Sequence, residues 1–397
     1  MPATKFKINA KQDIIKTVTD WDSLGALIGV KVNLLTWCLH ERENMQTKIR
    51  LGKRTVYKSG TYLHFIQKRI EMLVTALFDE LPDTDCAIAY RKGQKPVDVL
   101  REIPHAKLLI TTDVRKYYDN ITLEHLTKAL EFLGFPHLGA KLIARYCVVR
   151  NDRNHRLTLQ QGCPASPVLS NLVGHVFFDL PFRKWLDETY PDVTMRYVRY
   201  CDNLALFVLD EYPSSLPGAV SAKLTESLRE HGFRLHKWRR IPDNHPMVNQ
   251  SFLGIVLNHE KRVALDYADR LRATLFTWCR LGKAHATNQF IEENGLVLSH
   301  AFIARDLQQA KFVAHMRGCV QYVQGINEKQ GKMLRKLLNA AELLDQNEYS
   351  TVRMACNLDS EIFRLLKTYR NNNESPNAYT TRLQQALSLS RFVKAAA

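Results

Sequence analysis

The chain has 397 residues, of which 45% are hydrophobic, and a formal net charge of +16. This apolar content is enough for a sizeable core, and the length predicts two or three domains. The positive surplus favours an acidic polymer as partner, with nucleic acid the commonest choice and an anionic membrane surface the alternative. The sequence has no run of 18 apolar residues and no apolar segment near its start, so we expect neither a membrane span nor a signal peptide.

Basic residues and cysteines are distributed differently along the chain. Residues 42–69 hold eight basic residues against one acid, and a second basic cluster covers 234–240. Each cluster alone could be a solvated surface, and phosphate binding is the other interpretation. The eight cysteines are scattered without a CxxC pair, which predicts reduced thiols in the cytoplasm and no zinc site.

The first half of the chain gives clear signals for helices and one strand. Apolar residues at helical spacing predict helices over 13–40 and 61–80, with Ser23 or Asp22 as a cap in the first. The apolar run 107–114 predicts a buried strand that ends near Asp113, and a helix follows over 123–133.

The second half begins with a loop, because Gly162, Pro164 and Pro167 prevent a helix before residue 167. A helix follows this loop. Residues 194–209 alternate in polarity and predict two strands with a turn at 201–203. The remaining pattern predicts a helix over 219–231, an apolar segment over 252–258 and mostly helix over 266–366.

Two carboxylates stand out by their setting. Asp113 ends one predicted strand, and Asp202 lies in the turn of a predicted hairpin. If the strands are neighbours, both carboxylates reach one edge of a sheet. Hard oxygen ligands of this kind suit Mg²⁺, and two ions about 3.5–4 Å apart can hold the attacking and leaving oxygens of a phosphoryl transfer. Either aspartate alone is weak support, since an acid at a strand end is usually only a turn residue.

Three segments then occur in a telling order: DVRKYY at 113–118, QGCPASPVLSN at 161–171 and YCDN at 200–203. They resemble motifs A, B and C of reverse transcriptases, and the middle segment is the most specific. Further segments resemble the fingers, motif D, primer-grip and thumb motifs of that family, at 53–57, 89–93, 232–236, 252–258 and 316–322. The resemblance covers roughly residues 15–330.

The resemblance implies an α+β right-hand polymerase fold with fingers, palm and thumb, and with helical N-terminal and C-terminal segments. The implied divisions are N-terminal helices and fingers at 1–105, palm at 106–260, helical thumb at 261–335 and a helical C-terminal extension at 336–397. The implied reaction is RNA-directed DNA synthesis from deoxynucleoside triphosphates, with two Mg²⁺ ions that Mn²⁺ could replace.

The resemblance also assigns roles to residues. Asp113 and Asp202 would be catalytic and bind both metals, with the carbonyl of Val114 as a further ligand. Nucleotide contacts would come from Lys53, Arg54, Arg91, Tyr118, Gln161 and Gly162. Primer and template contacts would come from Tyr200, Cys201, Lys237, Arg239, Phe252, Leu253, Gly254 and Arg317. Tyr118 would exclude a 2′-hydroxyl group, with a core aromatic as the alternative, and Arg91 could instead be a plain surface charge.

One position departs from the family pattern. Asn203 stands where the resemblance expects a second acid, which would complete the catalytic set with Asp113 and Asp202. An amide keeps an oxygen but loses the charge, so this departure puts the rate in doubt more than the fold. Either the protein diverged naturally or it carries an inactivating substitution. The lysine expected in motif D falls near Arg239, with Lys237 as the alternative.

The branch of the family is a narrower question. The helical start resembles bacterial retron and defence-associated enzymes, but residues 101–105 keep only His105 of the retron signature, and Phe252-Leu-Gly254 replaces a second one. The defence-associated class, with a structured non-coding RNA as companion and template, fits best. The alternatives are a catalytically silent RNA-binding protein and an untemplated or protein-primed DNA synthesiser. The oligomeric state stays open.

Overall fold

The computed structural model describes residues 12–51, 54–151, 155–245, 248–258, 261–294 and 305–346. The chain divides into two compact units, residues 1–252 and 253–397. The first unit therefore ends inside the range 106–260 that the sequence predicts as one domain.

The first unit begins with the short helices α1 (Gln12–Ile15), α2 (Trp21–Ile28) and α3 (Val32–His40). Asp20 is the N-cap of α2, because its carboxylate accepts a hydrogen bond from the Ser23 amide at 2.8 Å. The expectation that Ser23 or Asp22 caps this helix was wrong. Ser23 is instead the reciprocal partner of a capping box, and its hydroxyl accepts from the Asp20 amide.

No single helix in the described ranges is long and apolar enough to cross a membrane. By length and composition, α2 and α3 taken together pass as a bent pair, with an angle of 110° between them.

A two-stranded hairpin and a long helix follow. Strands β1 (Gln46–Leu51) and β2 (Arg54–Ser59) pair antiparallel, and α4 (Thr61–Glu80) confirms the helix expected over 61–80. The buried face of α4 includes Leu63, Ile66 and Ile70, at the three- and four-residue spacing of one helical face. The short elements η1 (Thr84–Cys86) and α5 (Pro96–Glu102) lead to the central sheet.

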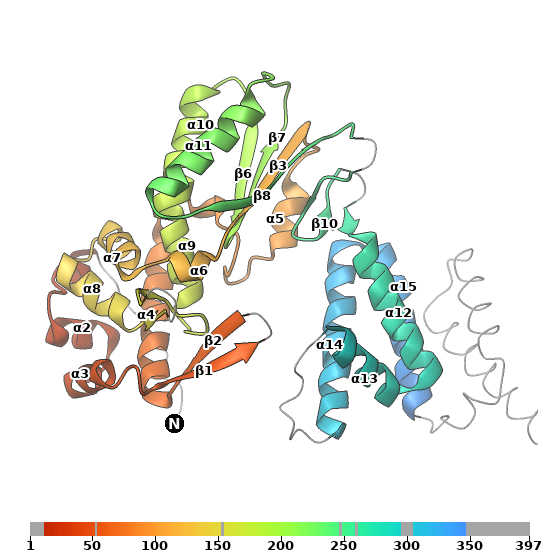
Figure 1. Ribbon diagram of the computed structural model, residues 1–397, viewed down its shortest axis with the longest axis horizontal. Coiled ribbons are helices and arrows are strands. Elements are labelled where there is room, and N and C mark those ends of the chain that lie inside the picture. The colour runs from red at the N-terminus through yellow and green to blue at the C-terminus, as the bar shows by residue number, and fades with distance from the viewer. Residues whose placement is uncertain are drawn as a thin grey trace, which may run out of the picture. The chain divides into compact units, whose positions relative to one another are not determined.

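The central sheet of this unit has four antiparallel strands in the order β6-β7-β3-β8 (Figure 1). The strands are β3 (Leu108–Val114), β6 (Met195–Tyr200), β7 (Asn203–Val208) and β8 (Leu235–Pro242). β3 confirms the predicted buried strand and lies between two partners. Helices α10 (Leu180–Thr189) and α11 (Leu216–Glu230) contribute Phe182 and Leu224 beside the sheet residues Ile110 and Tyr197, so they cover one face of the sheet.

The remaining elements of the first unit pack around α4 and the sheet. They are α6 (Tyr117–Asn120), α7 (Leu123–Phe132), α8 (His137–Arg145), β4 (Val148–Arg150), β5 (Leu157–Leu159), α9 (Ser166–Gly174), the π-helical turn η2 (His175–Asp179) and β9 (Ser251–Phe252). The predicted loop before Pro167 and the helix after it are confirmed by α9, and α7 and α11 confirm the other two helices.

The second unit is mostly helical, as its sequence predicts for the part that the structure describes. A small antiparallel pair, β10 (Ile255–Val256) and β11 (Arg262–Val263), precedes α12 (Leu265–Leu281), α13 (Lys283–Asn294), α14 (Arg305–Ile326) and α15 (Glu328–Gln346). Trp278 is buried, and its indole donates a hydrogen bond to Asp345 at 2.6 Å. Helix α15 crosses the division expected at 335/336, and residues 347–397 lie outside the described ranges.

Candidate active site

The two aspartates of the predicted site come together at one end of the central sheet. Asp113 lies opposite Asn203 in the antiparallel pairing of β3 with β7. The next residue, Val114, donates its amide hydrogen to the carbonyl oxygen of Asp202 at 2.8 Å. The end of β3 therefore meets the turn between β6 and β7, as the sequence predicts. The Asp113 side chain is 32% exposed, so solvent or a ligand can reach it.

Polar side chains lie next to both carboxylates. The Asn203 amide nitrogen donates a hydrogen bond to Oδ1 of Asp202 at 3.0 Å. His236 of β8 places Nδ1 3.4 Å from Oδ2 of Asp113, which is an ion pair when the imidazole is protonated. Sequence reasoning missed His236, although it ends the segment 232–236 that resembles motif D. A bulge in β8 brings it opposite Asp113.

The side chains at this sheet edge fit a hard divalent cation, which the two carboxylates would bind. Asp113 and Asp202 supply negatively charged oxygens from adjoining chain segments, which is the ligand chemistry that Mg²⁺ and Mn²⁺ prefer. In the described ranges, no group of three or more His, Cys, Asp or Glu residues is arranged to hold a metal ion. Further ligands would therefore have to be backbone, water or substrate oxygens.

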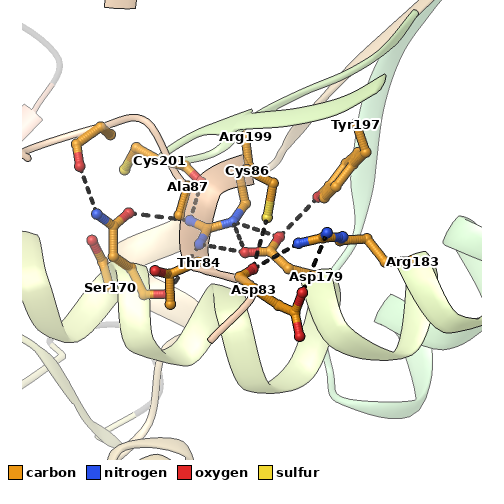
Figure 2. A network of polar contacts seen from close by, with 12 residues as sticks. Asp83, Thr84, Cys86, Ala87, Ser170, Asp179, Arg183, Tyr197, Arg199 and Cys201 are labelled. Atoms are coloured by element: carbon orange, nitrogen blue, oxygen red, sulfur yellow. Dashed lines mark hydrogen bonds and ion pairs between the residues drawn. The ribbon is translucent and has the colours of Figure 1, made fainter. Parts of the chain in front are cut away.

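The turn that carries Asp202 is supported from below by a buried ion pair (Figure 2). Arg199 and Asp179 are both fully buried, and two guanidinium nitrogens donate to the two carboxylate oxygens at 2.8 Å each. The same guanidinium donates to the carbonyl of Cys201 at 3.3 Å and to the carbonyl of Asn171 at 3.0 Å. Tyr197 donates its hydroxyl to Asp179 at 3.0 Å, so the carboxylate has a third partner.

The guanidinium of Arg199 stays charged despite its burial. Burial alone would lower the pKa of Arg199, but the carboxylate of Asp179 outweighs burial and holds the pKa of the guanidinium well above its usual value. Gly174 leaves the space that this guanidinium occupies, because a Cβ atom at position 174 would lie 2.3 Å from the guanidinium carbon of Arg199. Cys201 itself has a left-handed backbone with φ 57°, and the bond from Arg199 to its carbonyl helps to hold this conformation. Sequence reasoning missed Arg199, Asp179 and Gly174.

The segment that resembles motif B anchors the β1–β2 hairpin. The carbonyl of Gln161 accepts a hydrogen bond from the Tyr57 amide at 2.7 Å. Gly162 has φ 103°, and a Cβ atom there would lie 2.5 Å from the Tyr57 carbonyl. Glycine is thus required at position 162 because the backbone at Tyr57 lies too close for a side chain. The buried side chain of Gln160, which sequence reasoning missed, donates to Ser59 at 2.9 Å and accepts from Gln67 at 3.1 Å.

The two tyrosines after Asp113 have different environments. Tyr117 is 2% exposed, and its hydroxyl donates to the Ser170 carbonyl at 2.6 Å. Tyr118 is only partly buried, and its hydroxyl lies 3.3 Å from the Ser170 hydroxyl. Burial raises the pKa of the Tyr118 phenol, so it stays neutral at ordinary pH. Tyr118 is therefore the ring of the pair that a ligand can reach.

The contacts of Arg91 favour a structural role. Its guanidinium donates to Asp79 at 2.7 Å, to the Thr84 carbonyl at 2.8 Å and to the Ala87 carbonyl at 3.2 Å. It also lies over the Phe78 ring, 5.0 Å from the centroid. These partners leave the side chain only 16% exposed, so it is more an anchor of its own loop than a group presented to a triphosphate.

The basic residues of the predicted site are only partly described. Lys53 and the side chain of Arg54 lie outside the described residues. Lys237 and Arg239 are exposed on β8, and Lys237 has a left-handed backbone with φ 56° at the bulge. In the second unit, Arg317 of α14 pairs with Glu342 of α15 at 2.8 Å.

The predicted primer-contacting residues differ in exposure. Phe252 is only 5% exposed, and its ring packs edge-on against Phe207, so it is a core residue of the first unit. Leu253 and Gly254 have positive φ angles of 53° and 78°, which is typical of a tight hairpin turn. Tyr200 lies at the end of β6 and is partly buried.

Comparison with known proteins agrees with this geometry. Residues 57–239 match the family described as reverse transcriptase (RNA-dependent DNA polymerase). The match covers just under half of the chain and includes every residue discussed above around Asp113 and Asp202. It supports a reverse transcriptase, and with it RNA-directed DNA polymerase activity in general. The mixed helix-and-sheet structure fits a right-hand polymerase fold.

Solved telomerase structures are similar at a lower level. Telomerase from Candida albicans, in complex with a fragment of telomeric RNA, is 12% identical with a TM-score of 0.41, and the match covers 87% of this chain and 69% of that one. Apo telomerase from Candida tropicalis is 10% identical with a TM-score of 0.43, and the match covers 84% of this chain and 63% of that one. At these values, neither likeness says anything about function.

Proposed function

We propose that the protein is an RNA-directed DNA polymerase that adds deoxynucleotides to a primer along an RNA template. The observation that carries this proposal is the meeting of Asp113 and Asp202 at one end of the central sheet, inside the segment that matches the reverse transcriptase family. The reaction is the attack of a primer 3′-hydroxyl on the α-phosphate of a deoxynucleoside triphosphate. Pyrophosphate leaves, and the DNA strand grows by one nucleotide.

In this proposal Asp113 and Asp202 hold two divalent ions, Mg²⁺ in the cell with Mn²⁺ as a possible substitute, and the Val114 carbonyl adds a ligand. Bound ions would neutralise charge on the triphosphate, which is the main requirement of phosphoryl transfer. The exposed cations Lys237 and Arg239 lie on β8, which pairs with the strand of Asp113, and so can add positive charge for the pyrophosphate.

The template and setting rest on the sequence. The net charge of +16 favours a nucleic-acid partner, and the motifs resemble those of defence-associated enzymes. We therefore propose a structured non-coding RNA as companion and template, and a role in antiviral defence in the cytoplasm. The fingers, palm and thumb would follow the divisions at 105, 260 and 335, although α15 continues through the last of these.

One observation favours a second candidate, a silent RNA-binding protein. The Asn203 amide donates a hydrogen bond to the Asp202 carboxylate, where an acid would add negative charge. This contact partly satisfies Asp202 without a metal ion and weakens the attraction for two cations. The polymerase hypothesis therefore predicts that the protein with Asn203 synthesises DNA slowly and binds RNA normally.

The test is a primer-extension assay on the protein and on its Asn203→Asp variant, with the RNA that copurifies and with Mg²⁺ or Mn²⁺. We expect the variant to be faster by about 10²–10³-fold, because an electrostatic loss of about 3–4 kcal/mol would be restored. Asn203→Ser is the matched control, since it removes the amide without adding charge. If Asn203→Asp makes no DNA with either metal while RNA binding is unchanged, the silent-binder function replaces the polymerase.

A further inference from the structure

Helix α4 carries a row of exposed apolar side chains beside its buried face. Tyr62 is 56% exposed, Phe65 41% and Met72 43%, whereas Leu63 and Ile66 on the neighbouring face are buried in the core. The exposed residues are three and seven positions apart, so they form one stripe that runs about 15 Å along the helix. Single exposed apolar residues are common, but a continuous row of them marks an interaction surface.

Two further residues complete this stripe. Trp37 of α3 is 46% exposed, and its ring meets that of Tyr62 edge-on, with 5.6 Å between the centroids. An edge-on contact leaves ring surface that neither partner covers. Arg69 follows Phe65 by one helical turn, and its guanidinium lies over the Phe65 ring, 5.2 Å from the centroid. We call Trp37, Tyr62, Phe65, Arg69 and Met72 the aromatic stripe.

The surroundings of the aromatic stripe are basic. It begins at Tyr62, three residues after the end of β2, and the β1–β2 hairpin exposes Lys48, Arg50 and Lys58. On α4 itself, Lys68 is exposed and pairs with Glu71 at 2.6 Å. Even with this pair, residues 42–69 hold eight basic residues against one acid.

This combination of rings and positive charge fits one kind of partner best. The centre of a protein–protein interface is depleted in charged residues, and lysine is depleted most consistently. Surfaces that bind single-stranded nucleic acid instead combine aromatic rings, on which bases stack, with cations that neutralise the backbone. The aromatic stripe has both features, and the guanidinium of Arg69 brings them together at the Phe65 ring.

We propose that the aromatic stripe binds an unpaired segment of RNA, whose bases stack on the rings of Trp37, Tyr62 and Phe65. This inference rests on the proposed function for the identity of the polymer, and it adds a binding surface to the candidate active site. Paired RNA does not suit this surface, because its bases are already stacked on each other. Every base has an aromatic face, so binding should tolerate changes of RNA sequence.

Stacking and charge can be separated by their response to salt. Loss of a cation lowers the slope of log affinity against log salt, because fewer counterions are released on binding. Loss of a ring should lower the affinity and leave this slope unchanged. Leucine in place of a ring keeps apolar surface but cannot stack, so a protein-docking surface would tolerate it better than an RNA-binding one.

The first experiment uses the full, unaltered chain. A single-stranded oligouridylate of about 12 nucleotides, within the site sizes of such surfaces, carries photoreactive 5-iodouridine and is crosslinked to the protein by light. We expect mass spectrometry to find crosslinks at Trp37, Tyr62 or Phe65. An RNA duplex of the same length should compete poorly. Crosslinks confined to other segments, or equal competition by the duplex, would overturn the proposal.

The second experiment measures the affinity of labelled oligouridylate by fluorescence anisotropy at several salt concentrations. Phe65→Leu should bind about 10-fold more weakly at an unchanged salt slope, which is the effect of losing one base–aromatic stack. Phe65→Tyr keeps the ring and should bind like the parent. Phe132→Leu is the matched control, because Phe132 is an exposed aromatic residue of α7 outside the aromatic stripe.

An unchanged affinity of Phe65→Leu overturns the proposal. If that variant also self-associates less than the parent in sedimentation, the aromatic stripe is an interface between copies of the chain instead. Neither experiment requires DNA synthesis. A failure of the Asn203→Asp protein to make DNA would therefore contradict the polymerase function alone, and it would leave the RNA-binding surface to be judged by its own result.

Discussion

The two sides of the Tyr200–Asn203 turn differ in how their polar groups are satisfied. On one side, called the lower side, the guanidinium of Arg199 and the carboxylate of Asp179 are fully buried, and each makes several hydrogen bonds within the protein. On the other side, called the upper side, Asp113 is partly exposed, and Nδ1 of His236 lies 3.4 Å from its carboxylate.

The buried side therefore contributes to the stability of the fold, and the exposed side carries the proposed chemistry. A buried charge is tolerated only when it is paired and hydrogen bonded, so the lower side must be complete in the folded protein. The upper side presents carboxylates that repel each other and that a cation would stabilise. The lower side holds the turn in place through the Cys201 carbonyl, so the upper carboxylates need no contact with each other to be positioned.

The sharpest test of this separation removes a carboxylate from the upper side. In the Asn203→Asp background, Asp113→Ala or Asp202→Ala should lower the rate of DNA synthesis by more than about 10³-fold, because the ligands of the divalent ions are removed. The unfolding free energy should change by less than about 1 kcal/mol. Primer extension and thermal unfolding measure the two effects. Asp187→Ala on α10 is the exposed control, and retained synthesis in either site variant would contradict the assignment.

A change on the lower side should have the opposite profile. Arg199→Met leaves Asp179 buried and unpaired, so we expect the unfolding free energy to fall by about 3–5 kcal/mol. Urea unfolding at equilibrium measures it. In the double variant Arg199→Met/Asp179→Leu the uncompensated charge is gone, and most of the stability should be recovered. If the single variant is as stable as the parent, the buried pair does not support the turn.

The neighbouring tyrosines give a milder version of the same contrast. Tyr118→Val should raise the incorporation of ribonucleotides relative to deoxynucleotides by about 10- to 200-fold, since excluding one group contributes about 1–3 kcal/mol. Tyr117→Phe is the matched control: it removes the buried bond to the Ser170 carbonyl, so it should affect stability and leave the ratio unchanged. An active Tyr118→Val protein with an unchanged ratio would make Tyr118 a core residue.

The smallest effect should come from a region that belongs to neither side. Lys48, Arg50 and Lys58 are exposed on the β1–β2 hairpin, inside the basic cluster 42–69. Replacing each by alanine should weaken RNA binding and lower the slope of log affinity against log salt by about one for each RNA phosphate that the variant no longer binds. Filter binding at several salt concentrations measures the slope. Lys184→Ala on α10 should leave it unchanged, and an equal slope in all variants would argue against phosphate binding by this basic cluster.

The sequence predicted the upper side of the turn better than the lower side. Asp113 and Asp202 could be found because each stands at the end of an apolar strand pattern within a recognisable segment. The partnership of Arg199 with Asp179 could not, because it depends on how a helix packs on a strand twenty residues away. The only available signal was an acid inside the apolar run HVFFDLPF at 175–182.

Local conformation was also beyond the sequence pattern in several places. The cap at Asp20 was missed because Ser23 has an equally good capping side chain, and the choice depends on the entry angle of the chain. The left-handed backbones at Tyr90 and Lys237 carry no residue preference, since tertiary contacts impose them. The role of Arg91 was open for the same reason, because the fold brings it to partners in residues 79–87 that no sequence pattern indicates.

The close approach of Gly174 to Arg199 restricts how this protein can change by single substitutions. Any side chain at position 174 would occupy the space of the guanidinium, and any smaller residue at 199 would leave Asp179 charged and unpaired. Neither position can therefore vary first without a large decrease in stability, and Asp179 cannot lose its charge while Arg199 keeps its own. Substitutions at these three positions are therefore coupled. They can accumulate only if they occur nearly together or after other changes have raised the stability of the protein.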